Sequence, residues 1–407
     1  MTSNLPLEDI RVIDFGQMWA GPHLTQWLAG MGAQVIKVES ALKIDFMRMV
    51  GAPPGIERGN PDGGTAFMSL NFAKQSVMLN MNKPKAQEIA RALIKKSDVV
   101  TENFGGPVLE RWGLSYEELK KIKPDIIVYA GSGYGRSGPH RKRPAYAEIV
   151  EAFDGSTYLN GYPGSNPYTV GVSPWTDATQ AMHGAFAVMA ALYHRNKTGE
   201  GQYIDAAMIE GSINFLGEIV MAYNMNGDTG ERMGNRDKMM APHGCYRCNG
   251  EDEWVAIAIT GEDDWQAFCK AIGNPEWARR EEFSTRINRL KNQDELDALI
   301  TEWTKEYHQY EIMESLQKVG IAAGCSLNIK DLVNDPQLKT RKFFIDMKHP
   351  VVGELTLAGL PWRPTDGFTP EYSPPPLLGE HNYDVFEGIL GLSREAIDKL
   401  IAKEVIK

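Results

Sequence analysis

The order of apolar and polar segments predicts an α/β fold with a parallel sheet. The run RVIDFG, residues 11–16, is short and apolar and ends in glycine, as a buried strand often does. It is followed by AGPHLTQWLAGMGA, a helix entered through Gly21 and Pro22, and then by a second strand, QVIKVES. A strand–helix–strand unit pairs its strands in parallel with a right-handed crossover.

The same alternation continues along the chain. Further strands are expected at 75–81, 99–104 and 125–133, and helices at 84–98, 105–113, 115–124 and 177–193. The segment 203–208 is either another buried strand or the entry to a further helix. Strands that alternate with helices predict a sheet with helices on both faces.

The character of the sequence changes after about residue 226. A polar linker rich in glycine is followed by CYRCNGEDEWVAIAIT, which predicts a hairpin with Asn249 and Gly250 as its turn. Helices are expected beyond it, so this part predicts a smaller α+β domain. The predicted domains are 1–226, 227–325 and a C-terminal segment, 326–407.

Composition excludes several classes of protein. The 407 residues are 43% hydrophobic and 24% charged, which is ordinary for a globular protein. A net charge of -10 argues against a binder of nucleic-acid backbones. No apolar run approaches the roughly 20 residues that span a bilayer, and no secretory signal is visible. Four cysteines do not make a disulfide framework, so we expect a cytoplasmic protein.

The one cysteine pattern worth testing is HGCYRCNG. Cys245 and Cys248 form a C-x-x-C with His243 nearby. A zinc site needs four ligands, and the sequence offers no second cluster. A redox pair is the other alternative. Ordinary strand and turn cysteines are favoured over both, because free cysteine is commonly buried, and no metal site is expected.

Motifs for nucleotide binding and for hydrolysis are incomplete or absent in the sequence. Gly133, Gly135 and Gly138 have the dinucleotide-binding spacing at a strand end, but Pro139 and a basic run follow where a helix should begin. The chain has no G-x-x-x-x-G-K-[ST], no G-x-S-x-G and no H-E-x-x-H. A nicotinamide site, a P-loop and a serine hydrolase are therefore all disfavoured.

Asp177 stands at the start of the long Ala-rich segment, which has no internal proline. By local sequence it is first a helix cap, because aspartate accepts the backbone N–H bonds left free at helix starts. The alternative is a catalytic carboxylate. One position can serve both roles, since the partial positive charge of a helix start favours an ionised carboxylate.

Nine phrases together resemble a known family. They are VIDFGQMWAGP, GAQVIKVE, LNFAKQSVMLN, VTENFGGPVLERWGLSYEEL, YAGSGYGRSGP, RPAYAEIVEAFDG, TDATQAMHGAFAVMAALYHRNKTGEGQYIDAAM, GNRDKMMAPHGCYRC and LLGEHNYDV. Their order along almost the whole chain resembles the class III CoA-transferases. That family includes formyl-CoA and carnitine CoA-transferases and shares its fold with α-methylacyl-CoA racemase.

The resemblance implies that Asp177 is the nucleophile. It fills the aspartate position of the family's D-x-x-x-[GA] pattern, with Ala181 where many members have glycine. A carboxylate there would attack a donor thioester, form a mixed anhydride and then an aspartyl-CoA thioester, and pass CoA to a second acid. CoA thioesters are thus expected as substrates, with no permanently bound cofactor.

Two positions bear on the reaction and the acid. The racemase histidine would fall where this chain has Tyr146, and a phenol with a pKa near 10 is a poor base, so transferase is favoured over racemase. Formyl-CoA transferases place glutamine where Trp19 stands. A tryptophan suits a larger, partly apolar acid, such as an aryl-succinate or a carnitine-like acid, with succinyl-CoA a plausible donor.

The resemblance also implies the CoA contacts. Lys74, Asn103, Phe104 and Arg111 match family positions that meet CoA. Arginine suits a phosphate because its fork binds two oxygens. The family often has a further arginine after VIKVE. Here Ser40 and Ala41 follow instead, with Lys43 or Arg48 as replacements.

The family's architecture gives the remaining expectations. It implies a Rossmann-like large domain formed by both chain ends, a smaller α+β domain between them, and an interlocked dimer. Acyl-CoA and a free carboxylic acid are the expected partners, without nucleic acid or membrane. A hetero-oligomer with a related subunit is the alternative to a homodimer. An acyl-CoA racemase or isomerase and a non-catalytic partner subunit stay open as alternatives to the transferase.

Overall fold

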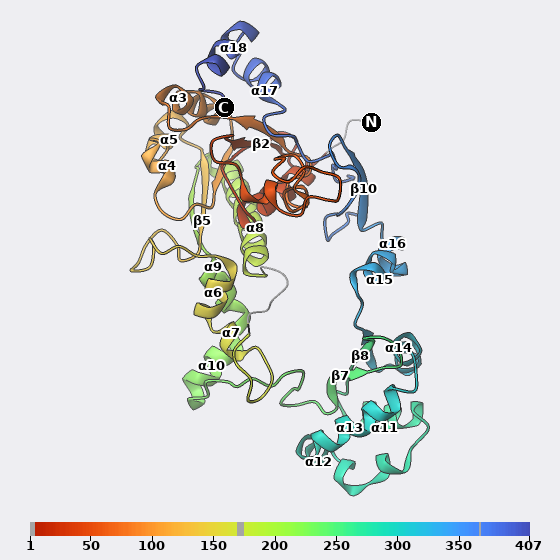
Figure 1. Ribbon diagram of the computed structural model, residues 1–407. Helices are drawn as coiled ribbons and strands as arrows, with labels where there is room; N and C mark the ends of the chain where they lie inside the picture. The colour runs from red at the N-terminus through yellow and green to blue at the C-terminus, as the bar shows by residue number, and fades with distance from the viewer. Residues whose placement is uncertain (1–4, 169–174, 366–367) are drawn as a thin grey trace. The chain divides into compact units, whose positions relative to one another are not determined.

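A computed structural model describes residues 5–168, 175–365 and 368–407 of the protein (Figure 1). The chain divides into two compact units. Unit 1 comprises residues 1–157, 169–228 and 339–407, and unit 2 comprises residues 158–168 and 229–338. The predicted domains 1–226 and 326–407 correspond to most of unit 1, and 227–325 to most of unit 2.

A six-stranded parallel sheet forms the centre of unit 1, in the order β3-β2-β1-β4-β5-β6. Its strands are β1 (Arg11–Asp14), β2 (Gln34–Glu39), β3 (Gln75–Met78), β4 (Val99–Glu102), β5 (Ile127–Ser132) and β6 (Tyr203–Ala207). Every adjacent pair is parallel, as the alternation of strands and helices predicts. The sequence predicted either a buried strand or the entry to a helix at 203–208. Residues 203–207 form β6, which is an edge strand of the sheet. Unit 1 also contains the antiparallel hairpin β10 (Phe344–His349) and β11 (Gly353–Ala358).

The α-helices are named here in the order in which they occur along the chain. They are α1 (Ala20–Gly30), α2 (Thr65–Met68), α3 (Pro84–Lys95), α4 (Val108–Arg111), α5 (Tyr116–Ile122), α6 (Ala147–Asp154), α7 (Ser156–Leu159), α8 (Trp175–Thr198), α9 (Met208–Ile213), α10 (Gly217–Asn226), α11 (Glu262–Ala271), α12 (Arg286–Lys291), α13 (Gln293–Thr304), α14 (Gln309–Gln317), α15 (Ile329–Asn334), α16 (Pro336–Thr340), α17 (Asn382–Gly388) and α18 (Arg394–Ala402). A short 3₁₀ helix, η1, spans Phe46–Met49.

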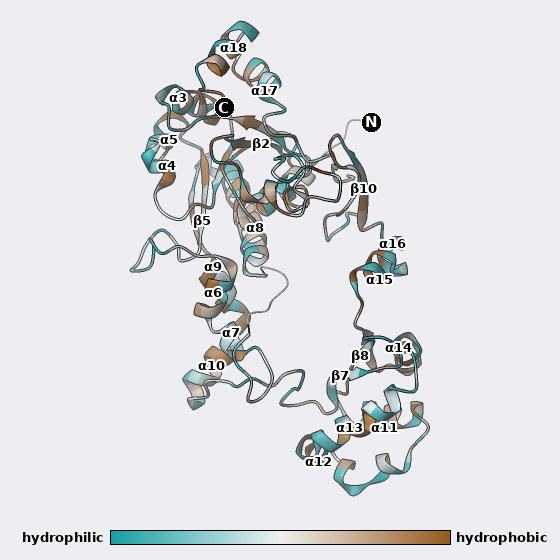
Figure 2. Ribbon diagram, viewed as in Figure 1, coloured by the Kyte–Doolittle hydropathy of each residue, from teal (hydrophilic) through white to brown (hydrophobic). Residues whose placement is uncertain are grey.

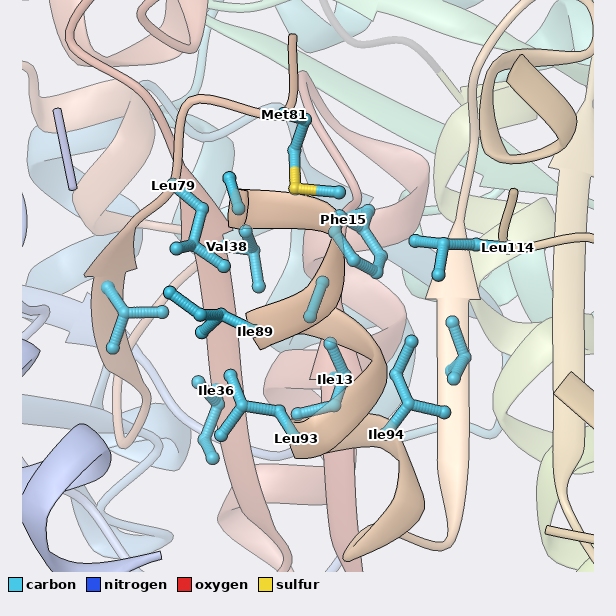
Figure 3. Close-up of a cluster of buried hydrophobic side chains, with 14 of the residues drawn as sticks. Ile13, Phe15, Ile36, Val38, Leu79, Met81, Ile89, Leu93, Ile94 and Leu114 are labelled. Carbon is cyan, nitrogen blue, oxygen red and sulfur yellow. The ribbon is translucent and has the colours of Figure 1, made fainter. Parts of the chain in front are cut away.

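Adjacent strand residues serve two separate cores, because successive side chains of a strand point to opposite faces. Ile13 packs with α3, α5, α17 and α18 on one face, whereas Val12 packs with α1 and α8 on the other. The first core, with Ile13 and Ile36 of the strands against Ile89 and Leu93 of α3, is shown in Figure 3. Apolar residues run through the strands, as the brown of β5 in Figure 2 shows. Helices therefore cover both faces, as predicted.

The longest helix described, α8, runs beside β5 (Figure 1) and also packs against α1. It is longer than the predicted 177–193, since it begins at Trp175 and continues to Thr198. Its end coincides with Gly199, whose φ of 76° is left-handed and favours glycine. A helix of this length is about 36 Å long. The helix therefore carries Asp177 at one end and the apolar core contacts along its middle.

Gly184 allows the close crossing of α8 and α1. A Cβ there would lie 2.3 Å from Leu24 Cδ1 and 2.8 Å from the Tyr129 hydroxyl, both on buried side chains. We expect Gly184→Ala to lower the free energy of unfolding by about 1–3 kcal/mol, because overpacking outweighs the helix propensity of alanine. Urea unfolding measures this. The control is Gly217→Ala in α10, where a Cβ meets nothing within 4 Å; equal stability of the two variants would contradict the prediction.

Unit 2 contains the predicted hairpin within a three-stranded antiparallel sheet, β7-β8-β9. Its strands are β7 (His243–Arg247), β8 (Trp254–Ala258) and β9 (Ala322–Cys325). Trp265 and Phe268 of α11 are fully buried with Leu296 of α13 and Leu316 of α14 in its core. The smaller α+β architecture predicted after residue 226 is therefore present.

Candidate active site

The candidate site lies where the strand order of the large sheet reverses. The chain winds outward from β1 through β2 to β3, and from β4 through β5 to β6. Parallel sheets bind ligands outside the carboxyl ends of the strands at such a switch point. Gln17 follows β1 and Asn103 follows β4. The Gln17 N–H donates to Asn103 Oδ1 at 2.8 Å, and Asn103 Nδ2 donates to the Gln17 carbonyl oxygen at 2.8 Å.

Asp177 occupies the third position of α8, within its first turn, so it is not the N-cap residue. The backbone N–H of Ala20 stabilises its ionised carboxylate and so lowers its pKa. Ala20 is the first residue of α1, and the N–H groups of a helix start have no partner inside their own helix. The carboxylate therefore receives its donor from a neighbouring helix, in addition to lying near the start of its own.

Burial raises the pKa of Asp177 to about 7. The Ala20 N–H opposes this rise because it stabilises the charged form, while the negative charges of Glu148 and Glu151 add to it. Burial is the largest of these influences. The side chain thus titrates close to neutral pH, where it can be either a carboxylic acid or a nucleophilic carboxylate.

We expect activity to rise with pH through a midpoint near 7, because only the ionised form of Asp177 is nucleophilic. A profile of kcat/KM from acid to alkaline pH measures this midpoint. Glu148→Gln should move the midpoint to lower pH, since it removes a charge that raises the Asp177 pKa. The exposed Glu117 of α5 provides the control, Glu117→Gln. A profile that is flat across neutral pH would contradict the prediction.

Asp177 lines a pocket of about 470 Å³ together with Trp19 and Tyr146. Three methionines, Met18, Met47 and Met208, form further parts of its wall. The complete lining of this pocket, called the acyl pocket below, is Gln17, Met18, Trp19, Met47, Asn103, Phe104, Gly105, Ser132, Gly133, Pro144, Ala145, Tyr146, Ala147, Glu148, Asp177, Gln180 and Met208. Within the described part of the chain, no lysine, arginine or histidine lines it.

A second pocket of about 510 Å³ lies against the ends of β2 and β3 and the start of α4. Lys43 and Arg111 line it, and neither side chain forms an ion pair with any described residue. Its apolar wall includes Phe15 and Trp112. This second pocket, called the cationic pocket below, can accept a large anionic ligand that also has a flat or apolar part.

The two pockets share Gln17 and Phe104. These two residues therefore border both the acyl pocket and the cationic pocket. Of the residues predicted from the sequence, the structure brings Trp19, Tyr146 and Asp177 together in the acyl pocket. It places Asn103 there as well, Arg111 in the cationic pocket and Phe104 in both.

Lys74 lies elsewhere and lines neither pocket. It is fully buried, and its ammonium donates to the Pro22 carbonyl oxygen and Thr25 Oγ1, each at 2.7 Å, and to Asn71 Oδ1 at 2.8 Å. It also forms an ion pair with the buried Asp14 at 3.3 Å. In this structure Lys74 fixes the start of α1, and its predicted contact with CoA stays a prediction.

Lys43 and Arg48 were the two replacements considered for the missing arginine, and the structure separates them. Lys43 faces the cationic pocket, whereas Arg48 is buried and donates to Glu39 at 2.7 and 2.8 Å. Ala181, which stands where many family members have glycine, is fully buried in the core and does not line the acyl pocket. It therefore fills the α1–α8 packing rather than the space around Asp177.

Several residues of the site carry no role in the sequence analysis, and Gln180, Glu148 and Met47 are examples. Gln180 lies one turn after Asp177, and its amide donates to the carbonyl oxygens of Ser132 at 3.3 Å and Ala206 at 3.2 Å. These hydrogen bonds connect the start of α8 to the ends of β5 and β6. Gln180 follows Asp177 by three residues, and this spacing could have indicated from the sequence that both lie on one helix face. Glu148 and Met47 gave no local signal, because they reach the pocket only through folding.

The C-x-x-C pair does not form a joint site. Cys245 lies within β7 and Cys248 follows it, so a spacing of three residues directs the two side chains to opposite faces. Cys248 packs in the core of unit 2, and burial raises the pKa of both thiols. Among the residues that the structure describes, no group of His, Cys, Asp and Glu could hold a metal ion.

Comparison with known proteins identifies the class. Residues 7–382 match the sequence model of CoA-transferase family III. The alpha subunit of succinyl-CoA–L-malate CoA-transferase from Chloroflexus aurantiacus is 33% identical over 99% of this chain and 93% of its own length. The beta subunit from the same organism is 34% identical over 100% of this chain and 99% of its own length.

A solved structure agrees with these relatives. The crystal structure of a CAIB/BAIF family protein from Brucella suis has a TM-score of 0.86 and 31% sequence identity, and covers 95% of this chain and 100% of its own. The fold, the site and these relatives define an enzyme that transfers CoA. The chain belongs to CoA-transferase family III. Across the described ranges, no helix is long and apolar enough to cross a membrane.

Proposed function

We propose that the protein moves CoA from an acyl-CoA donor to a free carboxylic acid through covalent intermediates on Asp177. The single observation that carries this proposal is the Asp177 carboxylate itself. It is partly buried in the acyl pocket, its pKa is raised to about 7, and the Ala20 N–H stabilises its ionised form. A partly desolvated carboxylate is a stronger nucleophile than one in water.

The proposed first half-reaction has two steps. An Asp177 oxygen attacks the thioester carbonyl carbon, the C–S bond breaks, and a mixed anhydride and the CoA thiolate result. The thiolate then attacks the Asp177 carbonyl carbon of the anhydride, which releases the donor acid and leaves an aspartyl-CoA thioester.

The second half-reaction reverses these steps with the acceptor carboxylate, which ends as an acyl-CoA while Asp177 is freed. The Ala20 N–H can donate to the oxygen that becomes negative during each attack on the Asp177 carbonyl. No step requires a net proton transfer or an oxidant, so the residues already present are sufficient for the chemistry.

CoA would occupy both pockets. Its phosphates fit the cationic pocket because Lys43 and Arg111 face that space without an ion-pair partner among the described residues. The adenine fits the apolar wall beside them. The thioester would then reach Asp177 by passing Gln17 and Phe104, which belong to both pockets.

The acceptor is proposed to be an acid larger than oxalate. Trp19, Tyr146 and the methionine side chains of the acyl pocket offer apolar contacts that oxalate and formate would not use. An aryl-succinate or a carnitine-like acid would fit. Succinyl-CoA is the proposed donor, because two relatives at 33% and 34% identity are named as succinyl-CoA–L-malate CoA-transferase subunits.

We also propose that the chain acts as a dimer. An exposed apolar stripe runs along α8 through Met182, Phe186, Met189 and Tyr193, and Phe186 is 72% exposed. Their spacing of three to four residues places them on one helix face. Exposed stripes of this kind mark protein–protein contacts. A homodimer is proposed, with a hetero-oligomer as the alternative because relatives are named as alpha and beta subunits. Sedimentation of the purified chain distinguishes dimer from monomer.

The test of the covalent mechanism is to trap Asp177. The protein is incubated with an acyl-CoA and treated with hydroxylamine, and the peptide that contains Asp177 is examined by mass spectrometry. A hydroxamate at Asp177 is expected. An unmodified Asp177, together with exchange of the α-proton in deuterated water, would instead support the racemase alternative. An unmodified Asp177 without exchange would support a non-catalytic subunit.

A further inference from the structure

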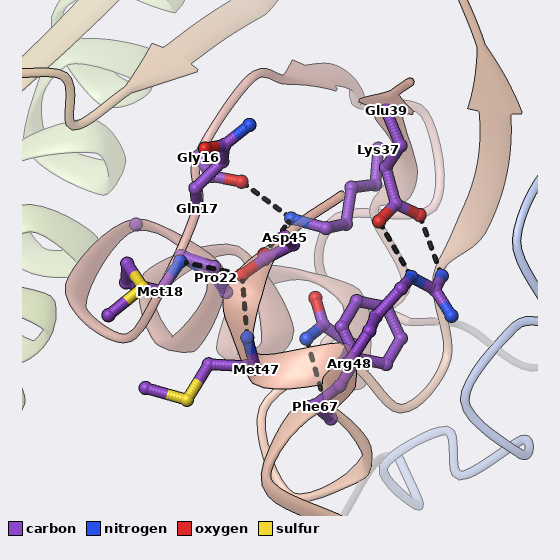
Figure 4. A network of polar contacts seen from close by, with 12 residues as sticks. Gly16, Gln17, Met18, Pro22, Lys37, Glu39, Asp45, Met47, Arg48 and Phe67 are labelled. Carbon is purple, nitrogen blue, oxygen red and sulfur yellow. Dashed lines mark hydrogen bonds and ion pairs between the residues drawn. The ribbon is translucent and has the colours of Figure 1, made fainter. Parts of the chain in front are cut away.

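A buried carboxylate outside both pockets joins two segments that form the wall of the acyl pocket. Asp45 is 2% exposed and precedes η1. Its Oδ1 accepts from the Met18 N–H at 3.1 Å and from the Met47 N–H at 3.2 Å (Figure 4). Met18 belongs to the loop between β1 and α1, and Met47 to η1, and both line the acyl pocket. One carboxylate oxygen thus fixes two parts of the wall.

Lys37 completes this arrangement. Its ammonium lies 3.2 Å from Asp45 Oδ2 and donates to the Gly16 carbonyl oxygen at 2.5 Å (Figure 4). Lys37 is fully buried on β2. A buried charge pair is costly to form and is strongly destabilising to break on one side only. Lys37 therefore holds Gly16 of this loop, while Asp45 holds Met18.

The loop needs these restraints because its backbone is strained. Met18 has a φ of 64°, which is in the left-handed region and unfavourable for a side chain of this kind. The next residues are Trp19, which lines the acyl pocket, and Ala20, whose N–H stabilises the ionised form of Asp177. The direction of the Ala20 N–H therefore depends on the conformation at Met18.

We propose that Asp45 is a positioning residue for Asp177, because its hydrogen bond with the Met18 N–H keeps the 16–20 loop in the conformation that directs the Ala20 N–H at the nucleophile. This inference rests on the proposed role of Asp177. Asp45 acts only through other groups. It does not line either pocket. Its Oδ1 already accepts from two N–H groups, and its Oδ2 faces the Lys37 ammonium.

Two double variants separate positioning from charge. Asp45→Asn with Lys37→Met keeps an amide oxygen that can accept from Met18 and Met47, whereas Asp45→Ala with Lys37→Met does not. Both lack the ion pair, so they differ in that acceptor and in the amide group that carries it. We expect kcat/KM of the alanine double variant to lie about 10–100-fold below that of the asparagine double variant, because misplacement of a catalytic contact lowers the rate by about this factor.

The pH profile supplies a readout that general destabilisation would not move. Because the Ala20 N–H lowers the pKa of Asp177, its loss should shift the acid limb of the alanine double to higher pH than that of the asparagine double. Asp98→Asn is the control for the loss of an ion pair. It removes the carboxylate that lies 3.0 Å from the Arg195 guanidinium, near the C-terminal end of α8. Equal turnover and equal midpoints in the two doubles would overturn the proposal.

Hydrogen exchange of the unaltered full chain tests the geometry if the doubles fail to fold. The Met18 amide should exchange as slowly as the amides of β1, because it donates to a buried carboxylate. Exchange as fast as that of the exposed 249–252 turn would overturn the proposal. Failure of the proposed function is recognised separately, since turnover retained by Asp177→Asn would overturn the nucleophile without changing the exchange result.

Discussion

Asp177→Asn should reduce kcat by about 1,000-fold or more, because an amide cannot form the anhydride and the aspartyl thioester on which the proposed exchange depends. Steady-state assays with an acyl-CoA and a panel of free acids measure this loss. The KM for acyl-CoA should change little, since the proposed CoA contacts lie mainly in the cationic pocket. Asp384→Asn is the matched control, because Asp384 also lies in the first turn of a helix, α17, but is exposed and lines neither pocket.

The same substitution should stabilise the fold at alkaline pH. The pKa of Asp177 is raised from 3.8 to about 7, so between these values the folded protein binds more protons than the unfolded chain. Stability of the wild type therefore falls as pH rises from about 4 to 7, and Asp177→Asn escapes this loss. At pH 8 the variant should have the higher Tm, and below pH 4 the two should coincide. Inactivity combined with lower stability at pH 8 would indicate a structural rather than a catalytic aspartate.

The second large effect is expected from removing both cations of the cationic pocket. Lys43→Ala with Arg111→Ala should raise the KM for acyl-CoA by about 10–100-fold with little change in kcat, because two charge-assisted contacts to phosphates are lost far from the reacting atoms. The effect should weaken as salt concentration rises, since salt screens the wild-type contacts.

An acyl-pantetheine thioester provides the control for this prediction. It carries the reacting group but lacks the adenosine phosphates, so wild type and variant should show the same KM for it. An equal increase in KM for acyl-CoA and acyl-pantetheine would contradict the assignment of Lys43 and Arg111 to the nucleotide end. A loss of kcat without a change in KM would indicate that the double substitution acts at a distance on the acyl pocket.

The strands and helices of the parallel sheet could be predicted from the sequence because their signals are local. Apolar runs such as 11–16 and 34–40 are bounded by glycine, proline or polar residues, and parallel strands buried on both faces need such continuous runs. Both strands are present, paired in register from Arg11 with Gln34. The dinucleotide-like motif at Gly133 was also excluded correctly as a strand–helix turn, since no helix follows β5 directly.

The site was harder to predict from the sequence than the fold, because its contacts join residues that are far apart along the chain. Asp177 was found because it begins a long helix and fits a family pattern. Lys74 matched a family phrase, yet its ammonium is directed into the protein by Asp14 and Asn71. Glu148 influences the pKa of Asp177 from a different helix, 29 positions earlier in the numbering. No local pattern encodes such a contact.

By itself, the sequence determined the α/β class, the parallel strands and the residue types available for the chemistry, because hydrophobic periodicity and helix-start preferences act over a few residues. The tertiary structure alone decided which of these residues meet. The Ala20 N–H reaches Asp177, Lys43 faces a pocket while Arg48 is buried, and Asp45 restrains Met18 from a separate segment. Those contacts depend on strand order and helix crossing, and burial then sets the pKa of the carboxylate, which no short stretch of sequence can specify.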